Sequence, residues 1–113
     1  MSDARMLLVL TTLPDEATAT RIARDLVARG LAACVSIGAP VRSIYRWQGV
    51  VEDAQEVPLT IKTGAAAYDA LAAALRAAHP YELPEIIAVP VERGLDEYLT
   101  WVGEHTRPDA PSA

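Results

Sequence analysis

The stretch that decides the fold runs from Ala32 to Thr63 and reads AACVSIGAPVRSIYRWQGVVEDAQEVPLTIKT. We interpret it as one long antiparallel hairpin with its turn near Gln48-Gly49. The first arm is interrupted at residues 38–40, and the second alternates apolar and polar residues towards Thr63. A period of two puts one set of side chains on a buried face and the other outward. Because strands usually run about 5 to 6 residues, we expect such long arms to extend beyond their own sheet and to pair with another subunit.

The segment before the hairpin predicts a strand and a helix. Residues 6–10 form a short apolar run that ends in polar residues, which is typical of a strand buried on both faces. Residues 15–29 then have apolar residues at helical spacing and acidic residues in the first turn. Gly30 can adopt the left-handed conformation that ends a helix.

The segment after the hairpin predicts a helix, a strand and a last helix. The second helix is expected to begin with Thr63 as its cap and to stop at Pro80. A strand follows at 86–89, and a short amphipathic helix follows at 95–102.

This order of elements predicts an α+β fold, a ferredoxin-like split β-α-β sandwich with a long hairpin and a short C-terminal helix. Residues 1–106 are expected to form one domain, and residues 107–113 a disordered tail. Both main helices cover one face of the sheet in this fold, so the other face needs another cover. A trimer or another ring would provide it.

Composition excludes several classes of function. Net charge is −5 and the basic residues are scattered, which argues against nucleic acid as a partner. No window approaches the roughly 20 apolar residues of a membrane span. A single cysteine and no signal-peptide pattern predict a cytoplasmic protein. No nucleophile elbow, phosphate loop or zinc-protease motif is present, so we predict that the protein is not an enzyme and has no organic cofactor.

Three residues are candidate metal ligands. Cys34 is the only thiol, and a copper(I) site would need it, although free cysteine on an apolar strand also suits a core. His79 precedes Pro80, where an imidazole commonly interacts with the helix dipole. With Glu82 it could also present a nitrogen and a carboxylate, the ligands that suit divalent copper or zinc.

A second group of candidates combines aromatic residues with the only lysine. Tyr45, Trp47 and Tyr81 either pack the hairpin against a neighbouring subunit or line a ligand cleft. Lys62 lies on the outward face of its expected strand, where a lysine is usually solvated but could bind an anion. If Lys62, His79, Tyr81 and Glu82 converge in a cleft between subunits, they would make a small-anion or metabolite site as readily as a metal site.

Five motifs resemble those of the divalent-cation tolerance family, CutA: TTLPD at 11–15, LAACV at 31–35, SIYRW at 43–47, IKT at 61–63 and HPYELPEI at 79–86. The resemblance covers roughly residues 6 to 104. It implies a ferredoxin-like protomer, a homotrimer held by strand pairing between subunits like that of the PII signalling proteins, and an association with copper and other divalent metals. It also supports Cys34 as a metal contact.

Two features depart from the family pattern or from a regular hairpin. Gln48 and Val50 reduce the acidity that family members often carry around the turn. Pro58 lies inside the second arm, where it has no N–H to donate, so we expect irregular pairing there.

Two hypotheses of function follow. The first is a cytoplasmic trimer involved in copper or other divalent-cation tolerance, which binds metal ions without catalytic turnover. The alternative is a PII-like trimeric signalling or scaffold module that binds a small anionic metabolite or a partner protein in clefts between subunits.

Overall fold

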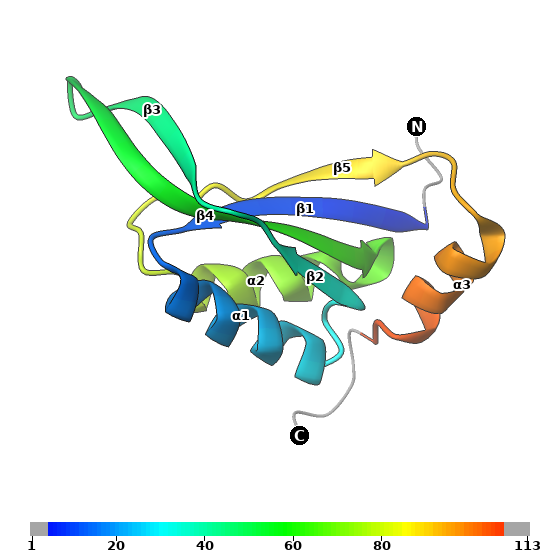
Figure 1. Ribbon diagram of the computed structural model, residues 1–113. Coiled ribbons are helices and arrows are strands. Elements are labelled where there is room, and N and C mark those ends of the chain that lie inside the picture. Colours follow the sequence, from blue (N-terminus) through cyan, green and yellow to red (C-terminus); the bar gives the residue numbers. More distant parts are fainter. Residues whose placement is uncertain (1–4, 108–113) are drawn as a thin grey trace.

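The computed structural model describes residues 5–107, in which the two long helices cover one side of an antiparallel sheet and a third helix lies at one end of it (Figure 1). Within this range the elements are β1 (Met6–Leu13), α1 (Glu16–Ala28), β2 (Cys34–Ile37), β3 (Val41–Trp47), β4 (Val50–Gly64), the 3-10 turn η1 (Ala65–Ala67), α2 (Tyr68–Ala78), β5 (Ile87–Val91) and α3 (Asp96–Glu104). The strand order is β2-β4-β1-β5, with β3 paired to β4. The predicted α+β class is confirmed. Of the predicted tail, residues 108–113 lie outside the described residues.

The predicted hairpin is present, and β4 is its long arm. Residues 50–56 pair with β3 and residues 57–64 pair with β1, so one strand serves both the hairpin and the sheet. Gln48 and Gly49 have φ angles of 50° and 82°, as the tight two-residue turn of a twisted hairpin requires. The β3–β4 end projects beyond the body of the protein (Figure 1).

A bulge separates β2 from β3. Pairing with β4 stops at Ile37 and resumes at Val41, and the three residues between them face only two residues of β4. One of those two is Pro58, whose carbonyl accepts the N–H of Gly38 at 2.9 Å. A Cβ on Gly38 would approach the Pro58 ring to 2.9 Å, so the contact requires glycine. The irregular pairing predicted at Pro58 is confirmed.

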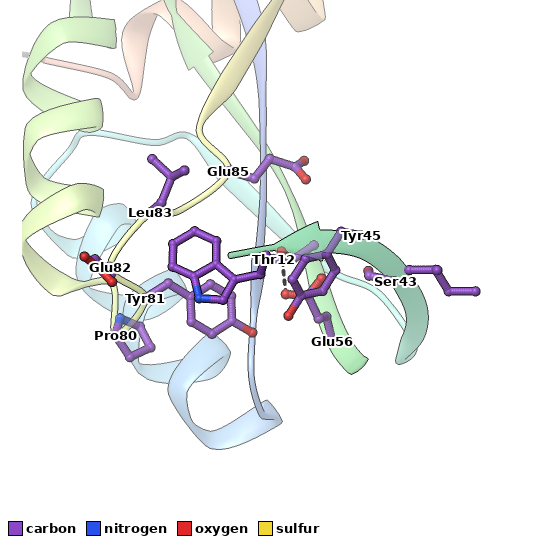
Figure 2. Close-up of a pocket in the computed structure, with 11 residues that line it drawn as sticks. Thr12, Ser43, Tyr45, Glu56, Pro80, Tyr81, Glu82, Leu83 and Glu85 are labelled. Atoms are coloured by element: carbon purple, nitrogen blue, oxygen red, sulfur yellow. Dashed lines mark hydrogen bonds between the residues drawn. The ribbon is translucent and has the colours of Figure 1, made fainter. Parts of the chain in front are cut away.

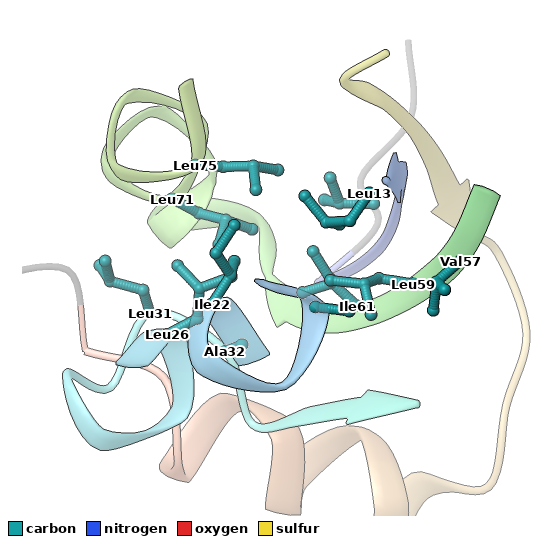
Figure 3. Close-up of a cluster of buried hydrophobic side chains, with 12 residues drawn as sticks. Leu13, Ile22, Leu26, Leu31, Ala32, Val57, Leu59, Ile61, Leu71 and Leu75 are labelled. Atoms are coloured by element: carbon teal, nitrogen blue, oxygen red, sulfur yellow. The ribbon is translucent and has the colours of Figure 1, made fainter. Parts of the chain in front are cut away.

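The core lies between the sheet and the two long helices (Figure 3). Alternate residues of β4, among them Val57, Leu59 and Ile61, face α1 and α2 as the period of two predicted. Asp15 caps α1 by accepting the N–H of Thr18 at 2.7 Å. Gly30 ends the helix with φ 71°, as predicted.

The prediction that Thr63 caps the second helix is wrong. Strand β4 continues through Gly64, and α2 begins only at Tyr68 after the 3-10 turn. Thr63 is buried, and its hydroxyl donates to the Leu31 carbonyl at 2.7 Å. Pairing along β1 extends the strand past the point where local capping preferences would end it.

Within residues 5–107, the second face of the sheet is covered only at one end. There α3 places Val102 against Met6 and Ala33. Leu8 packs against this cluster as well. Further along this face, Leu10 is half-buried, and its partner Ile87 of β5 is 51% exposed. The prediction that β1 is buried on both faces therefore fails in a single chain beyond the reach of α3. No helix in residues 5–107 is both long and apolar enough to cross a membrane.

Two buried threonines should respond in opposite ways to valine. Thr11 is 1% exposed, and its hydroxyl is the one fully buried side-chain oxygen in the described residues without a hydrogen bond. We expect Thr11→Val to stabilise the fold by about 1 kcal/mol, since an unsatisfied buried hydroxyl is removed at constant shape. The hydroxyl of Thr106 accepts from the Gly64 N–H at 3.2 Å and donates to the Val102 carbonyl at 2.8 Å.

Thr106→Val is the matched control and should destabilise by about 1–2 kcal/mol, because the Gly64 N–H loses its partner. Urea unfolding midpoints at equal protein concentration measure both changes. A loss of stability in Thr11→Val would contradict the assignment of its hydroxyl as unsatisfied.

Candidate functional site

The register of the hairpin collects functional side chains on one face of its base. Ser43, Tyr45 and Trp47 alternate along β3 and therefore point to the same side. Glu56 pairs with Val41, so it points to that side too. Opposite this face runs the proline-stiffened connection between α2 and β5, which begins at His79.

These segments enclose a cleft of about 730 Å³ (Figure 2). Its walls come from the end of β1, the base of the hairpin and the connection after α2. The lining residues are Thr12, Ser43, Ile44, Tyr45, Trp47, Glu56, Pro80, Tyr81, Glu82, Leu83 and Glu85. Three of them are glutamates and none is basic, so this cleft has a negative charge.

Glu56 is the buried acid of the cleft, with 7% of its surface exposed. Its Oε2 accepts a hydrogen bond from the Thr12 hydroxyl at 3.1 Å (Figure 2). The Tyr81 side chain also lines the cleft, and burial together with the nearby Glu56 carboxylate raises the pKa of Tyr81 far above its usual range. Within residues 5–107, Glu56 forms no ion pair.

His79 holds the wall of the cleft in place. It is 8% exposed, and its Nδ1 accepts the backbone N–H of Tyr81 at 3.2 Å. Nε2 therefore carries the proton and donates a hydrogen bond to the Thr12 carbonyl at 2.8 Å. Both ring nitrogens are engaged, and burial lowers the pKa of His79, so the ring is neutral. In this arrangement His79 offers no free nitrogen to a metal ion.

Cys34 and Lys62 lie together on the uncovered face of the sheet, apart from the cleft. They pair across β2 and β4, and Lys62 Nζ lies 3.9 Å from Cys34 Sγ and donates to the hydroxyl of Ser36. Lys62 pairs with Leu8, four residues along β1 from Thr12, which corresponds to about 13 Å. Within one chain Lys62 therefore lies outside the cleft, and its convergence with the cleft residues between subunits stays a prediction.

The sequence candidates thus fall into two places. Tyr45, Trp47, Tyr81 and Glu82 line the cleft, whereas Cys34 and Lys62 do not. The predicted ligand set of Cys34, His79 and Glu82 does not converge in one chain. Nowhere in the described part of the chain do three or more His, Cys, Asp or Glu side chains meet in a metal-binding group.

Sequence reasoning missed Glu56, Thr12, Ser43 and Glu85 as members of one site. The alternation along β4 did indicate that Glu56 points away from the helices. It could not indicate that the loop with Tyr81 closes over the same face, because that loop lies more than twenty residues further along the chain.

The chain is therefore a small mixed α+β protein with an acidic, aromatic cleft at the base of a projecting hairpin. Residues 7–105 match the family of the CutA1 divalent ion tolerance protein. The divalent-cation tolerance protein CutA of Thermus thermophilus is 48% identical over 98 residues, which are 87% of this chain and 95% of the relative. The protein CutA homolog of Xenopus laevis is 46% identical over 82% of this chain, which spans 62% of that longer relative.

Solved structures agree. CutA from Xylella fastidiosa has a TM-score of 0.89 at 46% identity, covering 92% of this chain and 100% of that one. The structure titled as the periplasmic divalent cation tolerance protein CutA of Archaeoglobus fulgidus has a TM-score of 0.85 at 37% identity, covering 88% and 97%. This chain belongs to the CutA1 divalent ion tolerance family, which confirms the resemblance of its motifs.

The buried neutral state of His79 predicts a loss of stability in acid. Because its pKa is lower in the folded protein than its ordinary value of 6.5, the unfolded chain binds the proton first as the pH falls. The contribution is complete above about pH 6.5 and is lost as the pH falls towards the folded pKa. We expect acidification from pH 7.5 to 5.5 to lower the urea midpoint of the wild type more than that of His79→Gln.

The glutamine keeps a donor for the Thr12 carbonyl but does not titrate. His105→Gln removes an exposed imidazole from the end of α3 and controls for the loss of a histidine as such. Equal losses in the wild type and His79→Gln would disprove the neutral, buried assignment.

Proposed function

We propose that this protein is a cytoplasmic homotrimer that binds copper or another divalent cation without catalytic turnover, as part of divalent-cation tolerance. The observation that carries the proposal is the charge of the cleft: three glutamates and no basic residue line it, in a chain of the CutA1 family. Carboxylate oxygens are common ligands of divalent ions. The relatives are named as tolerance proteins, and no enzyme name is found among those described above.

The ligand set of this proposal needs more than one chain. Glu82 and Glu85 are exposed at the rim of the cleft, where a neighbouring subunit could add further ligands. Cys34 is half-buried on the uncovered sheet face, where copies from three chains could supply a soft site that one chain lacks. A contribution from His79 would require it to release the Thr12 carbonyl or the Tyr81 N–H.

The trimer is proposed because a single chain leaves apolar surface uncovered. Val89 lies on the uncovered face of the sheet and is 47% exposed. Val51 on the projecting hairpin is 61% exposed. Apolar surface in contiguous patches marks protein interfaces, and the ferredoxin-like, PII-like assembly implied by the sequence motifs would cover these two regions. The cytoplasmic location is proposed on separate grounds. The single cysteine of the chain suits a reducing environment.

Substitution of the exposed valines tests the assembly. We expect Val89→Lys and Val51→Lys to convert a trimer into monomers, because a charged ammonium would be buried at the interface. Light scattering during size-exclusion chromatography measures the molar mass. Val27→Lys is the matched control, because Val27 is a 44% exposed valine on α1, which covers the other face of the sheet from Val89. A monomeric wild type would overturn the trimer, and trimers in both interface variants would overturn the assignment of these two regions as its interface.

Calorimetry tests the metal. The metal-free protein should bind copper(II), and zinc(II) as a redox-inert comparison, with a simple ratio of ions to subunits. Removal of a ligand should weaken binding by about tenfold or more. We expect this loss in Glu82→Gln for a cleft site or in Cys34→Ser for a site on the sheet face.

Glu104→Gln on α3, which does not line the cleft, should bind as the wild type. Unchanged affinity in both test variants would remove these ligands from the proposal. Binding without a defined ratio would count against metal binding as the function.

A further inference from the structure

We propose that the cleft at the base of the hairpin binds a small organic cation, an alkylammonium group, held against Glu56 between the aromatic side chains of Tyr45, Trp47 and Tyr81. This proposal goes beyond divalent-cation binding. It depends neither on the metal nor on the trimer, because all four residues line the cleft of one chain.

The buried carboxylate of Glu56 lacks a positively charged partner. Glu56 is 7% exposed, and within the described residues the hydrogen bond to its carboxylate comes from the neutral hydroxyl of Thr12. Burial of a charge is costly unless an opposite charge accompanies it. None of the described residues that line the cleft has a cationic side chain. A bound cation would supply the missing positive charge.

The aromatic side chains that line the cleft favour an organic cation over a metal ion as its ligand. Tyr45 and Trp47 come from β3 and Tyr81 from the facing loop, so aromatic rings approach from two sides of Glu56. The faces of such rings attract alkylammonium groups, and rings gathered around a cleft are a common way to recognise them. A divalent ion instead needs several oxygen, nitrogen or sulfur ligands at short range. Residues 5–107 contain no group of three acidic, histidine or cysteine side chains to provide them.

The volume of the cleft also fits a small organic molecule. A volume of about 730 Å³ lies within the range of small-molecule sites, roughly 300–1,000 Å³, and is far larger than a dehydrated ion requires. Glu82 and Glu85 are exposed at the rim (Figure 2), where their charges would attract a cation and repel an anion. The only lysine of the chain, Lys62, lies outside the cleft and therefore does not neutralise its glutamates.

Fluorescence of Trp47 tests the proposal directly. The chain has two tryptophans, and Trp101→Phe leaves Trp47 as the only one. In EDTA, to exclude metal ions, this variant is titrated with choline and separately with 3,3-dimethylbutan-1-ol, the uncharged analogue of the same shape. We expect saturable quenching by choline and none by the alcohol.

Two further variants in the Trp101→Phe background test whether the Glu56 carboxylate and the Tyr45 ring contribute to choline binding. Glu56→Gln keeps an acceptor for the Thr12 hydroxyl and should weaken choline binding by about tenfold or more. Tyr45→Ala, at a side chain 44% exposed, should weaken it several-fold without affecting the fold. Glu92→Gln, an exposed acid that does not line the cleft, is the control and should bind choline like its parent.

Absence of saturable quenching by choline would overturn the proposal. Equal binding of the alcohol, or undiminished binding in both Glu56→Gln and Tyr45→Ala, would overturn it as well. Because the titration is done in EDTA, a negative result leaves the metal proposal standing. Failure of the metal calorimetry likewise leaves this one standing.

Discussion

The structure depends on the unbroken pairing of β4, which joins the core to the hairpin in one strand. Residues 57–64 of this strand pair with β1 above the helices, and residues 50–56 pair with β3 beyond the sheet. The bulge opposite Pro58 lets the first arm change direction while β4 continues. The bulge occurs where proline lacks an N–H to donate, so the irregularity leaves no donor unpaired at that residue.

The charge of the cleft follows from the same strand. Val57 faces the helices, and Glu56, one residue earlier, must point to the opposite side because side chains alternate. Nothing in β4 alone would bury that carboxylate. The loop after α2 buries it by placing Tyr81 against it, and His79 fixes this loop through bonds to Thr12 and to the backbone of Tyr81. The histidine thus supports the wall of the cleft, while the acids and rings determine which ligands the cleft favours.

The uncovered face of the sheet raises a separate question of assembly. Its residues near α3 are covered within the chain, whereas the part around Ile87 and Val89 is not. Cys34 and Lys62 lie on this face as neighbours, so any role they have depends on what covers it. The residues that line the cleft and the exposed residues Ile87 and Val89 of the sheet face are different residues of one chain, so the two regions can be altered independently.

Local sequence patterns were enough to predict several features of the fold. These are the hairpin and its turn, the alternating face of β4, the irregularity at Pro58, the end of α1 at Gly30 and the motifs of the family. Three features follow from contacts between distant segments: β4 continues through Thr63, Lys62 lies outside the cleft, and Glu56 is buried within it. Turns and side-chain alternation depend on neighbours in the chain. Sheet register and loop closure depend on contacts between segments far apart in sequence, and these contacts set the charge and membership of the site.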